Sequence, residues 1–219
     1  MLPGWRIESR GRVNASEPAP NAGAGPGELG VRGIEEAAAR FGRPVERSYR
    51  LDVGQEDFRH RKRIRAKRCG EVILAVRRKN GEFLLHTKTF YPPGAYRLPS
   101  GGVEPGEDLA TAVGREAREE TGLDLCIDRF LGILRYRFCW RGLESDFASH
   151  VFLLSEIGGT LAAQDIGERI SGYREVPLSE LPEVARALEH LADPGWEAWG
   201  RFRALAHRFV AEVLSQDSG

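Results

Sequence analysis

Short apolar runs that are typical of strands dominate the middle of the chain. Residues 71–88, EVILAVRRKNGEFLLHTK, contain two such runs joined by Asn80-Gly81. This dipeptide is a strong signal for a β-hairpin, because both residues accept the positive φ that a type I′ turn requires. Residues 43–53 alternate loosely as a strand would, and the later runs that favour strands are residues 130–138, 147–154 and 173–176.

Helical patterns lie on both sides of these strands. The run IEEAAARF, residues 34–41, favours a short helix. Residues 108–121 form a second helical segment, with Gly122 where a left-handed C-terminal cap would stand. Two further helices are predicted over residues 181–191 and 196–214. The last of these has apolar residues at helical spacing, as packing in a core or a dimer requires.

Composition divides the chain into four regions. Residues 1–33 include a stretch rich in Gly, Ala, Pro, Ser and Asn, which predicts a flexible lead. Residues 34–68 are expected to form a helix and strand extension, for which dimerisation is one hypothesis, and residues 193–219 a C-terminal helix. Between them, residues 69–192 hold strands around a central helix, which predicts an α/β domain with a mixed sheet flanked by helices. A chain of 219 residues is long enough for one such domain with extensions, but short for two.

The overall charge points to no charged partner. Lys plus Arg and Asp plus Glu number 32 each, so affinity for phosphate must be local, and a nucleic acid partner is not expected. No apolar run approaches the roughly 18 residues of a membrane span, and the start lacks the pattern of a secretory signal. The cysteines Cys69, Cys126 and Cys139 show no metal or disulfide spacing, which fits free thiols in a reducing compartment. We therefore expect a cytoplasmic protein.

One local basic run stands out against this balance. Residues 59–68, RHRKRIRAKR, could follow a phosphate backbone, since clustered cations do so in nucleic-acid-binding proteins. Only Phe58 is near for base stacking. A solvated strand or a dimer edge is the preferred interpretation, with attraction for substrate phosphates as the next.

Three glutamates in the helical segment 108–121 carry the main chemical signal. Glu116, Glu119 and Glu120 stand at i, i+3 and i+4, so their carboxylates project from one face of one helix. Like charges at this spacing repel each other, and a hard divalent cation with oxygen ligands would reverse the sign of the interaction. The glycine-rich loop before the helix, residues 98–107, lets the backbone approach a metal or phosphate closely. Loop and helix form one candidate site.

The loop and the helix together resemble the Nudix box. Gly101 is followed after five residues by Glu107, and after seven more by the run REAREETGL, residues 115–123, so all seven invariant positions are present. The pattern departs from the family at Ala117, where a larger aliphatic is usual, and at Ser100, where many members have glycine. Neither change removes a charged group.

This resemblance implies a Nudix-type α/β/α sandwich with a mixed sheet and a loop-helix-loop metal site. Glu116, Glu119 and Glu120 would bind the metal with a backbone carbonyl at about Ser100. Mg²⁺ is the expected ion, with Mn²⁺ as the alternative.

Other box residues would support these ligands. Glu107 and Arg115 would hold the loop to the helix and orient the ligand carboxylates, and so affect catalysis without touching substrate. Gly101 and Gly122 would give the motif its shape.

The implied reaction is attack of water on a phosphorus of a nucleoside diphosphate linked to another moiety, such as a nucleotide sugar, a dinucleotide or a nucleoside triphosphate. Glu168 is the preferred general base, because family members often place a glutamate for this task well downstream of the box. Glu104, Glu116 and Glu120 are alternatives, and a solvated loop carboxylate is the plain interpretation of Glu168.

Residues ahead of the box are candidates for binding the substrate. Aromatic faces and guanidinium groups can stack on a base or bind a phosphate, although loop packing explains them as well. The candidates are Tyr91, Tyr96, Arg97 and Arg77, with Phe90 beside them. The five scattered histidines receive no role.

Two other functions compete with hydrolysis. One is an isomerase of prenyl diphosphates, which uses the same fold but needs a catalytic cysteine, and Cys69 is the nearest cysteine before the box. The other is a regulator that only binds its ligand, although such proteins tend to lose box glutamates, which this chain retains. ADP-ribose is disfavoured as the substrate, because the proline that its cleaving enzymes carry soon after the box is missing.

Overall fold

A single mixed sheet forms the middle layer of the protein. The computed structural model describes residues 31–65, 67–68 and 70–216, so most of the predicted lead and Cys69 lie outside the described residues. The strand order is β1-β5-β6-β2-β3-β7, with β4 paired to β2. The β1–β5 and β2–β6 pairs are parallel, and the other pairs are antiparallel. The strands are β1 (Val45–Asp52), β2 (Gly70–Arg77), β3 (Phe83–Lys88), β4 (Ser100–Val103), β5 (Leu123–Trp140), β6 (Leu143–Gly159) and β7 (Ile170–Val176).

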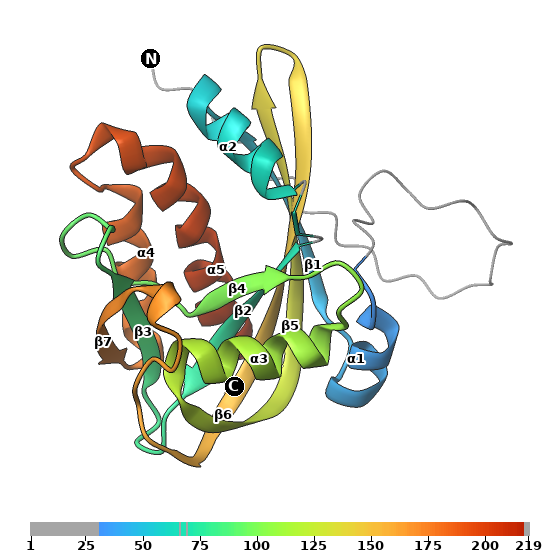
Figure 1. Cartoon of the computed structure of the whole chain (residues 1–219), viewed down its shortest axis with the longest axis vertical. Helices are drawn as coiled ribbons and strands as arrows, with labels where there is room; N and C mark the ends of the chain where they lie inside the picture. Colours follow the sequence, from blue (N-terminus) through green and yellow to red (C-terminus); the bar gives the residue numbers. More distant parts are fainter. Residues whose placement is uncertain (1–30, 66, 69, 217–219) are drawn as a thin grey trace, which may run out of the picture.

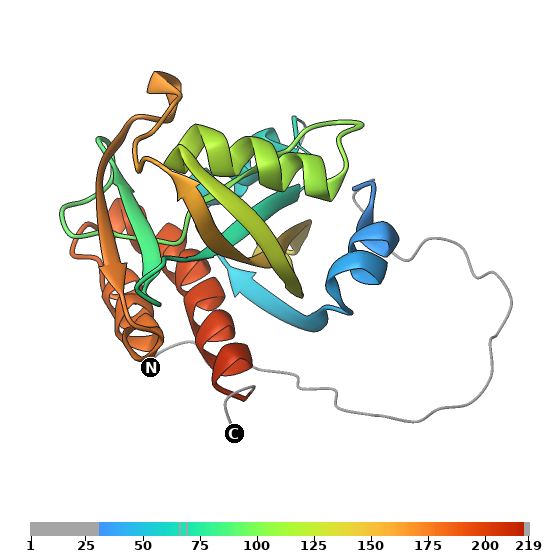
Figure 2. The same ribbon diagram turned by 90° about the horizontal axis from the view of Figure 1, so that it is seen from below.

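Helices cover both faces of this sheet. On one face lie α1 (Ile34–Phe41) and α3 (Leu109–Thr121), and on the other α4 (Leu181–Glu189) and α5 (Glu197–Gln216). Figure 2 shows α3 and α5 on opposite sides of the strands. Each face has its own apolar core, because alternate side chains of β2 and β3 point to opposite sides. The α/β/α sandwich predicted from the sequence is therefore confirmed. Three short 3₁₀ helices complete the described elements: η1 (Ile166–Glu168), η2 (Leu178–Glu180) and η3 (Pro194–Trp196).

The predicted hairpin exists, but its turn differs from the prediction. The amide of Gly81 donates to the carbonyl of Arg78 at 2.9 Å, and within this turn only Gly81 has a positive φ, of 87°. Asn80 therefore does not take part in a type I′ turn. The pair of positive φ angles that such a turn needs occurs instead at Arg141 (46°) and Gly142 (78°), which join the long strands β5 and β6.

Residues 59–65 of the basic run are part of a helix, so the prediction of a solvated strand there was wrong. Residues Gln55–Arg65 form α2, which lies beside the far end of the β5–β6 hairpin (Figure 1). Phe58 is buried against Trp140, with ring centroids 6.0 Å apart. The Arg61 guanidinium lies over the ring of Phe138 at 3.8 Å. A helix with few apolar residues is thus held by tertiary contacts that its own sequence does not reveal.

The last helix belongs to the main core. Phe202, Phe209 and Val213 of α5 are buried against the sheet, as the apolar spacing predicted. The region set apart as residues 193–219 is therefore packed closely with the rest of the domain, at least as far as the described Gln216. None of the described helices is long and apolar enough to cross a membrane.

Candidate active site

The helix that carries the three glutamates has well-defined ends. Asp108 caps its first turn, because Oδ1 accepts a hydrogen bond from the amide of Thr111 at 3.0 Å. Gly122 ends it in the left-handed conformation, with φ 66°, as the sequence predicted. Ala112 and Val113 are buried against the sheet. Packing on that face fixes the rotation of α3 and so the direction of its carboxylates.

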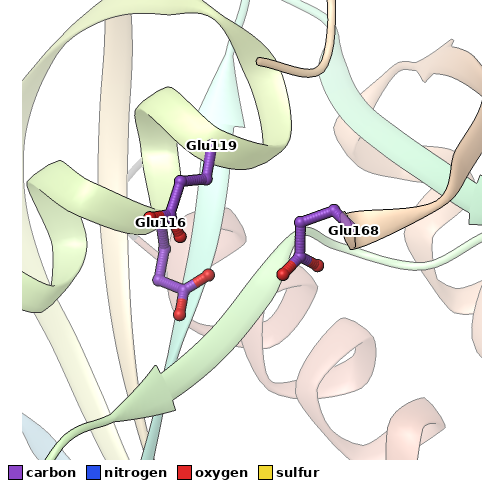
Figure 3. A group of neighbouring side chains, drawn as sticks. All are labelled: Glu116, Glu119 and Glu168. Atoms are coloured by element: carbon purple, nitrogen blue, oxygen red, sulfur yellow. The ribbon is translucent and has the colours of Figure 1, made fainter. Parts of the chain in front are cut away.

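An acidic cluster forms between this helix and a distant loop. Oxygen atoms of Glu116, Glu119 and Glu168 all lie within 4.8 Å of one another. Figure 3 shows Glu116 and Glu119 projecting from α3 toward Glu168, which comes from η1, just before β7. The structure therefore brings the base candidate Glu168 close to Glu116 and Glu119, two of the predicted metal ligands. Three carboxylates from two elements are an oxygen-only donor set, which suits a hard divalent cation.

Arg115 links the glycine-rich loop to the acidic cluster. Its Nε and Nη2 donate to the two carboxylate oxygens of Glu107, each at 2.9 Å, and Nη2 also donates to the carbonyl of Gly102 at 2.8 Å. Its Nη1 donates to Glu116 at 2.8 Å and to Glu119 at 3.1 Å. One guanidinium thus orients two carboxylates of the cluster, in the way that the family resemblance implied for Glu107 and Arg115.

Gly101 makes room for one of these carboxylates. A Cβ atom at this position would lie 1.7 to 2.0 Å from the carboxylate atoms of Glu116. The neighbouring Ser100 is buried, and its amide donates to Glu120 Oε2 at 2.8 Å. The start of β4 is therefore held between two glutamates of α3.

Glu120 lies beside the cluster, where it contacts Glu168, and it also faces cations. It is fully buried, with Oε1 at 3.0 Å from Lys88 Nζ and at 3.9 Å from Arg97 Nη2. His86 is buried beside it, 4.0 Å away, and neither ring nitrogen has a hydrogen-bond partner among the described residues. Lys88 also pairs with Glu168. Among the described residues, Glu120 is not part of the group of three carboxylates that could hold a metal.

The surroundings set the charge of each carboxylate. Burial raises the pKa of Glu116 to about 7, an effect that the charge of Glu120 assists and the hydrogen bond from Arg115 opposes. Burial likewise raises the pKa of Glu120 against the charges of Arg97 and Lys88. For Glu168, burial is outweighed by the hydrogen bond and charge of Lys88, so its pKa is lowered. A cation among these oxygens would stabilise the ionised carboxylates, and so oppose the effect of burial on the pKa of Glu116.

Burial and the charges of Arg97 and Lys88 lower the pKa of His86 well below its ordinary value. The imidazole is therefore neutral at pH 7. The two positive charges that face Glu120 are therefore those of Lys88 and Arg97, and His86 adds none.

Sequence reasoning missed Lys88 and His86. They stand two residues apart in β3 on the face toward α3, so alternation places both opposite Glu120 once the strand is placed beside the helix. A charged residue at the end of an apolar strand was the available signal.

The candidate substrate residues are not all brought together. Arg97 is buried, and it donates to the Tyr91 hydroxyl and to Ser100 Oγ, at 2.8 and 2.7 Å, close to Glu120. Tyr96 is half-buried against the same core. Arg77, the last residue of β2, pairs with Asp128 and does not contact Arg97, Tyr91 or Ser100. Cys69, on which the isomerase hypothesis depends, is not among the described residues.

The family that the box resembles is also the one found by comparison with known sequences. Residues 67–198 match the family model of the NUDIX domain. The chain belongs to the Nudix family. Over 113 residues it is 36% identical to an ADP-ribose pyrophosphatase of Methanocaldococcus jannaschii, covering 52% of this chain and 59% of that protein. Over 131 residues it is 34% identical to the NAD-capped RNA hydrolase NudC of Haemophilus influenzae, covering 56% of this chain and 47% of that protein. The chain thus spans about half the length of these relatives.

A solved Nudix-like structure is more distant in sequence. A UDP-X diphosphatase is 15% identical, with a TM-score of 0.48, and the match covers 76% of this chain and 73% of that one. Two curated relatives are named for different substrates, so membership of the Nudix family leaves the substrate of this chain to its own residues.

Proposed function

We propose that this Nudix protein is a divalent-metal-dependent hydrolase that cleaves the pyrophosphate bond of a nucleoside diphosphate linked to another moiety. The observation that carries the proposal is the meeting of Glu116, Glu119 and Glu168 within 4.8 Å, from two separate elements. The names of the curated relatives, an ADP-ribose pyrophosphatase and an NAD-capped RNA hydrolase, support this substrate class. Nucleotide sugars, dinucleotides and nucleoside triphosphates are the substrates to test.

The cluster fits Mg²⁺, or Mn²⁺ as the alternative, because all of its donors are carboxylate oxygens. In this proposal Glu116 and Glu119 hold the ion, with the carbonyl of Ser100 at the edge of the site and the carboxylate of Glu168 beside them. When bound, the ion supplies neutralising charge for the phosphate oxygens of the substrate. Glu120 supports the site indirectly. Its carboxylate accepts a hydrogen bond from the Ser100 amide at 2.8 Å and so fixes the start of β4.

Lys88 and Arg115 position the carboxylates of the site, and Lys88 favours the ionised form of Glu168. Lys88 holds Glu168 in its ionised form, because the neighbouring ammonium lowers the pKa of that carboxyl. An ionised Glu168 can take a proton from water at neutral pH, which keeps it as the proposed general base. Arg115 orients the carboxylates of Glu116 and Glu119 through its hydrogen bonds and needs no contact with substrate for this.

The proposal is tested by a substrate screen with the intact chain. Nucleotide sugars, dinucleoside polyphosphates, coenzymes and nucleoside triphosphates are incubated with Mg²⁺ or Mn²⁺, and the phosphate-containing products are separated and identified. We expect cleavage at a pyrophosphate bond that stops when EDTA removes the ion. A complete lack of turnover across the panel, or turnover that persists in EDTA, would contradict the proposal.

A further inference from the structure

A pocket lined by arginines lies under α2, away from the acidic cluster. Gly101 and Gly102 are adjacent in β4, and their Cβ directions point to opposite faces of the strand. The first meets the Glu116 carboxylate, whereas the second meets the side chain of Arg68, whose Cδ is 2.1 Å from the ideal Cβ position. Arg68 lines the pocket together with Arg61, Arg203, Glu71, Phe138 and Phe202. Figure 1 shows α2 on the side of the sheet where the β5–β6 hairpin extends.

Arg61 forms no ion pair with a described residue, although the charges of Asp57 and Glu71 act on it. Its guanidinium lies over the rings of Phe138 and Phe202, at 3.8 and 4.3 Å from their centroids. It forms no ion pair or hydrogen bond with another described residue, and its buried Nε has no partner. Burial, together with the charge of Arg203, lowers the pKa of Arg61 to about 10. Stacking on two aromatic rings stabilises the cation only in part, so its hydrogen-bond donors remain to be satisfied.

The acids of the pocket are already paired with other arginines. Glu71 accepts two hydrogen bonds from Arg203 Nη1, each at 2.9 Å, and also one from Ser149. Asp146, the other acid in the lining, pairs with Arg137 at 3.0 Å. Arg203 Nε is buried and has no partner in the described part of the chain. Among the described residues, the guanidinium groups of Arg61 and Arg68 have no hydrogen-bond or ion-pair partner, and one N–H of Arg203 has none.

We infer that Arg61, Arg68 and Arg203 form a binding site for a phosphate group. Guanidinium groups present several N–H donors in a plane, which matches the oxygens of a phosphate, and phosphate would provide the missing negative charge. Phe138 and Phe202 hold Arg61 in place before the anion arrives, so little side-chain freedom is lost on binding. Binding at this site does not depend on the hydrolysis proposed above.

The pocket is connected to the acidic cluster through Ser100. Arg203 Nη1 lies 3.3 Å from Ser100 Oγ, and the Ser100 amide contacts Glu120. A phosphate here has two sources: a further phosphate of the substrate itself, or a separate anion that binds beside it. Both present the same oxygens to the arginines.

The inference is tested by calorimetric titration of inorganic phosphate into the intact chain, at low salt and in EDTA. Without a divalent ion the acidic cluster repels phosphate, so the arginine pocket is the site observed. Arg61→Gln and Arg68→Gln should each raise the Kd about tenfold or more, because each removes a charge-assisted hydrogen bond. Arg63→Gln is the matched control, since Arg63 is exposed on the same helix and does not line the pocket.

The outcomes separate a built site from diffuse attraction. Loss of affinity in the two pocket variants with less than about a twofold change in Arg63→Gln supports the site. A wild-type chain that binds no phosphate, or an equal loss in all three variants, overturns it. Far-UV circular dichroism checks each fold, and the exposed Arg68 decides the question if Arg61→Gln is poorly folded.

Kinetics then distinguish the two sources of phosphate. If the substrate's own phosphate occupies the pocket, Arg61→Gln raises KM with little change in kcat, and inorganic phosphate competes with substrate. If a separate anion occupies it, Arg61→Gln has the wild-type KM in phosphate-free buffer, and added phosphate changes the rate of the wild type only. Either pattern supports the site, and the titration decides it even for a chain that shows no hydrolysis.

Discussion

The two ends of one carboxylate triplet have opposite surroundings. Glu116 and Glu119 meet a third carboxylate, Glu168, in a cluster whose repulsion favours a divalent cation. Glu120, one residue further along the same helix, is buried between Lys88 and Arg97. Spacing along a helix places carboxylates on one face, but the element packed opposite each of them decides whether it meets an anion or a cation.

This difference assigns different tasks to residues that look equivalent in the sequence. In the open cluster, named so because Glu119 and Glu168 are only half-buried, three carboxylates meet Arg115 and Lys88, so an added cation would still find excess negative charge among the described residues. The buried pair has its counter-charges built in, and its carboxylate fixes backbone at Ser100. Removing the charge of Glu119 should therefore affect mainly ion binding and catalysis, whereas removing Lys88 should lower stability and also raise the pKa of Glu168.

The largest effect is expected from Glu119→Gln, which removes one charge from the open cluster. We expect hydrolysis to fall about 10³-fold, or roughly 4 kcal/mol, because a donor is lost where the ion must neutralise the phosphate. The free energy of unfolding should change little, since Glu119 is only half-buried. Rates and Mn²⁺ titrations against Glu183→Gln, an exposed glutamate on α4, provide the measurement and its control. Unchanged Mn²⁺ affinity and rate would show that the cluster is not the metal site.

In the buried pair, Lys88 and Glu120, the change Lys88→Met should mainly lower stability. This change leaves Glu120 buried without its nearest cation, so the free energy of unfolding should fall by about 3 kcal/mol at pH 7 in urea denaturation. Lys79→Met, at an exposed lysine, is the control. The double variant Lys88→Met/Glu120→Gln should recover part of the loss, because the fully buried carboxylate that Lys88 neutralised is then uncharged, although Glu168 still lacks its lysine. Strict additivity of the two single changes would contradict the coupling.

The sequence predicted the open half of this comparison far better than the buried half. The helix, its C-terminal cap at Gly122 and the spacing of its glutamates are local features that the sequence predicted, whereas Asp108 was placed inside the helix and is its N-terminal cap. Glu168 was found because the family places a glutamate there. Lys88 and His86 could not be predicted, since their roles appear only when β3 lies beside α3 in the sheet.

The same distinction explains the errors in the fold. Helix α2 has few apolar residues, and it is held by Phe58 on Trp140 and Arg61 on Phe138, which are contacts with a distant hairpin. At Asn80-Gly81 the dipeptide predicted a turn correctly but not its type, because the hydrogen bond from Gly81 to Arg78 includes two more residues of the loop. Long-range packing overrides local preference in α2, whereas in the turn a longer loop replaces the expected two-residue one.

A pH-dependent loss of stability, of intermediate size, is expected from His207. This residue lies close to Arg97, which faces Glu120. Its Nε2 accepts the amide of Leu98 at 3.0 Å, next to Arg97, and burial lowers the pKa of the imidazole to about 4. Between pH 6.5 and 4 the unfolded chain binds the proton and the folded chain does not, so stability falls as the pH falls. This group alone should cost about 2 kcal/mol at pH 5 relative to pH 7.

The measurement is urea denaturation at several pH values, with His207→Gln for comparison. Glutamine can accept the Leu98 amide but does not titrate, so its stability should fall less on acidification. His190→Gln controls for an exposed histidine. Parallel pH profiles for wild type and His207→Gln would rule out this contribution.

The smallest effect is expected from Gly101→Ala, which changes the geometry of the open cluster without changing a charge. In Gly101→Ala, the new methyl group would occupy the space of the Glu116 carboxylate, so that carboxylate must move away from its hydrogen bond with Arg115. We expect about a tenfold lower rate, or roughly 1.4 kcal/mol, and weaker Mn²⁺ binding with an intact fold. Gly114→Ala, on the open side of α3, should leave the rate unchanged and stabilise the helix by about 0.5 to 1 kcal/mol. If Gly101→Ala bound Mn²⁺ and turned over substrate like the wild type, the position of Glu116 beside Gly101 would have no part in the site.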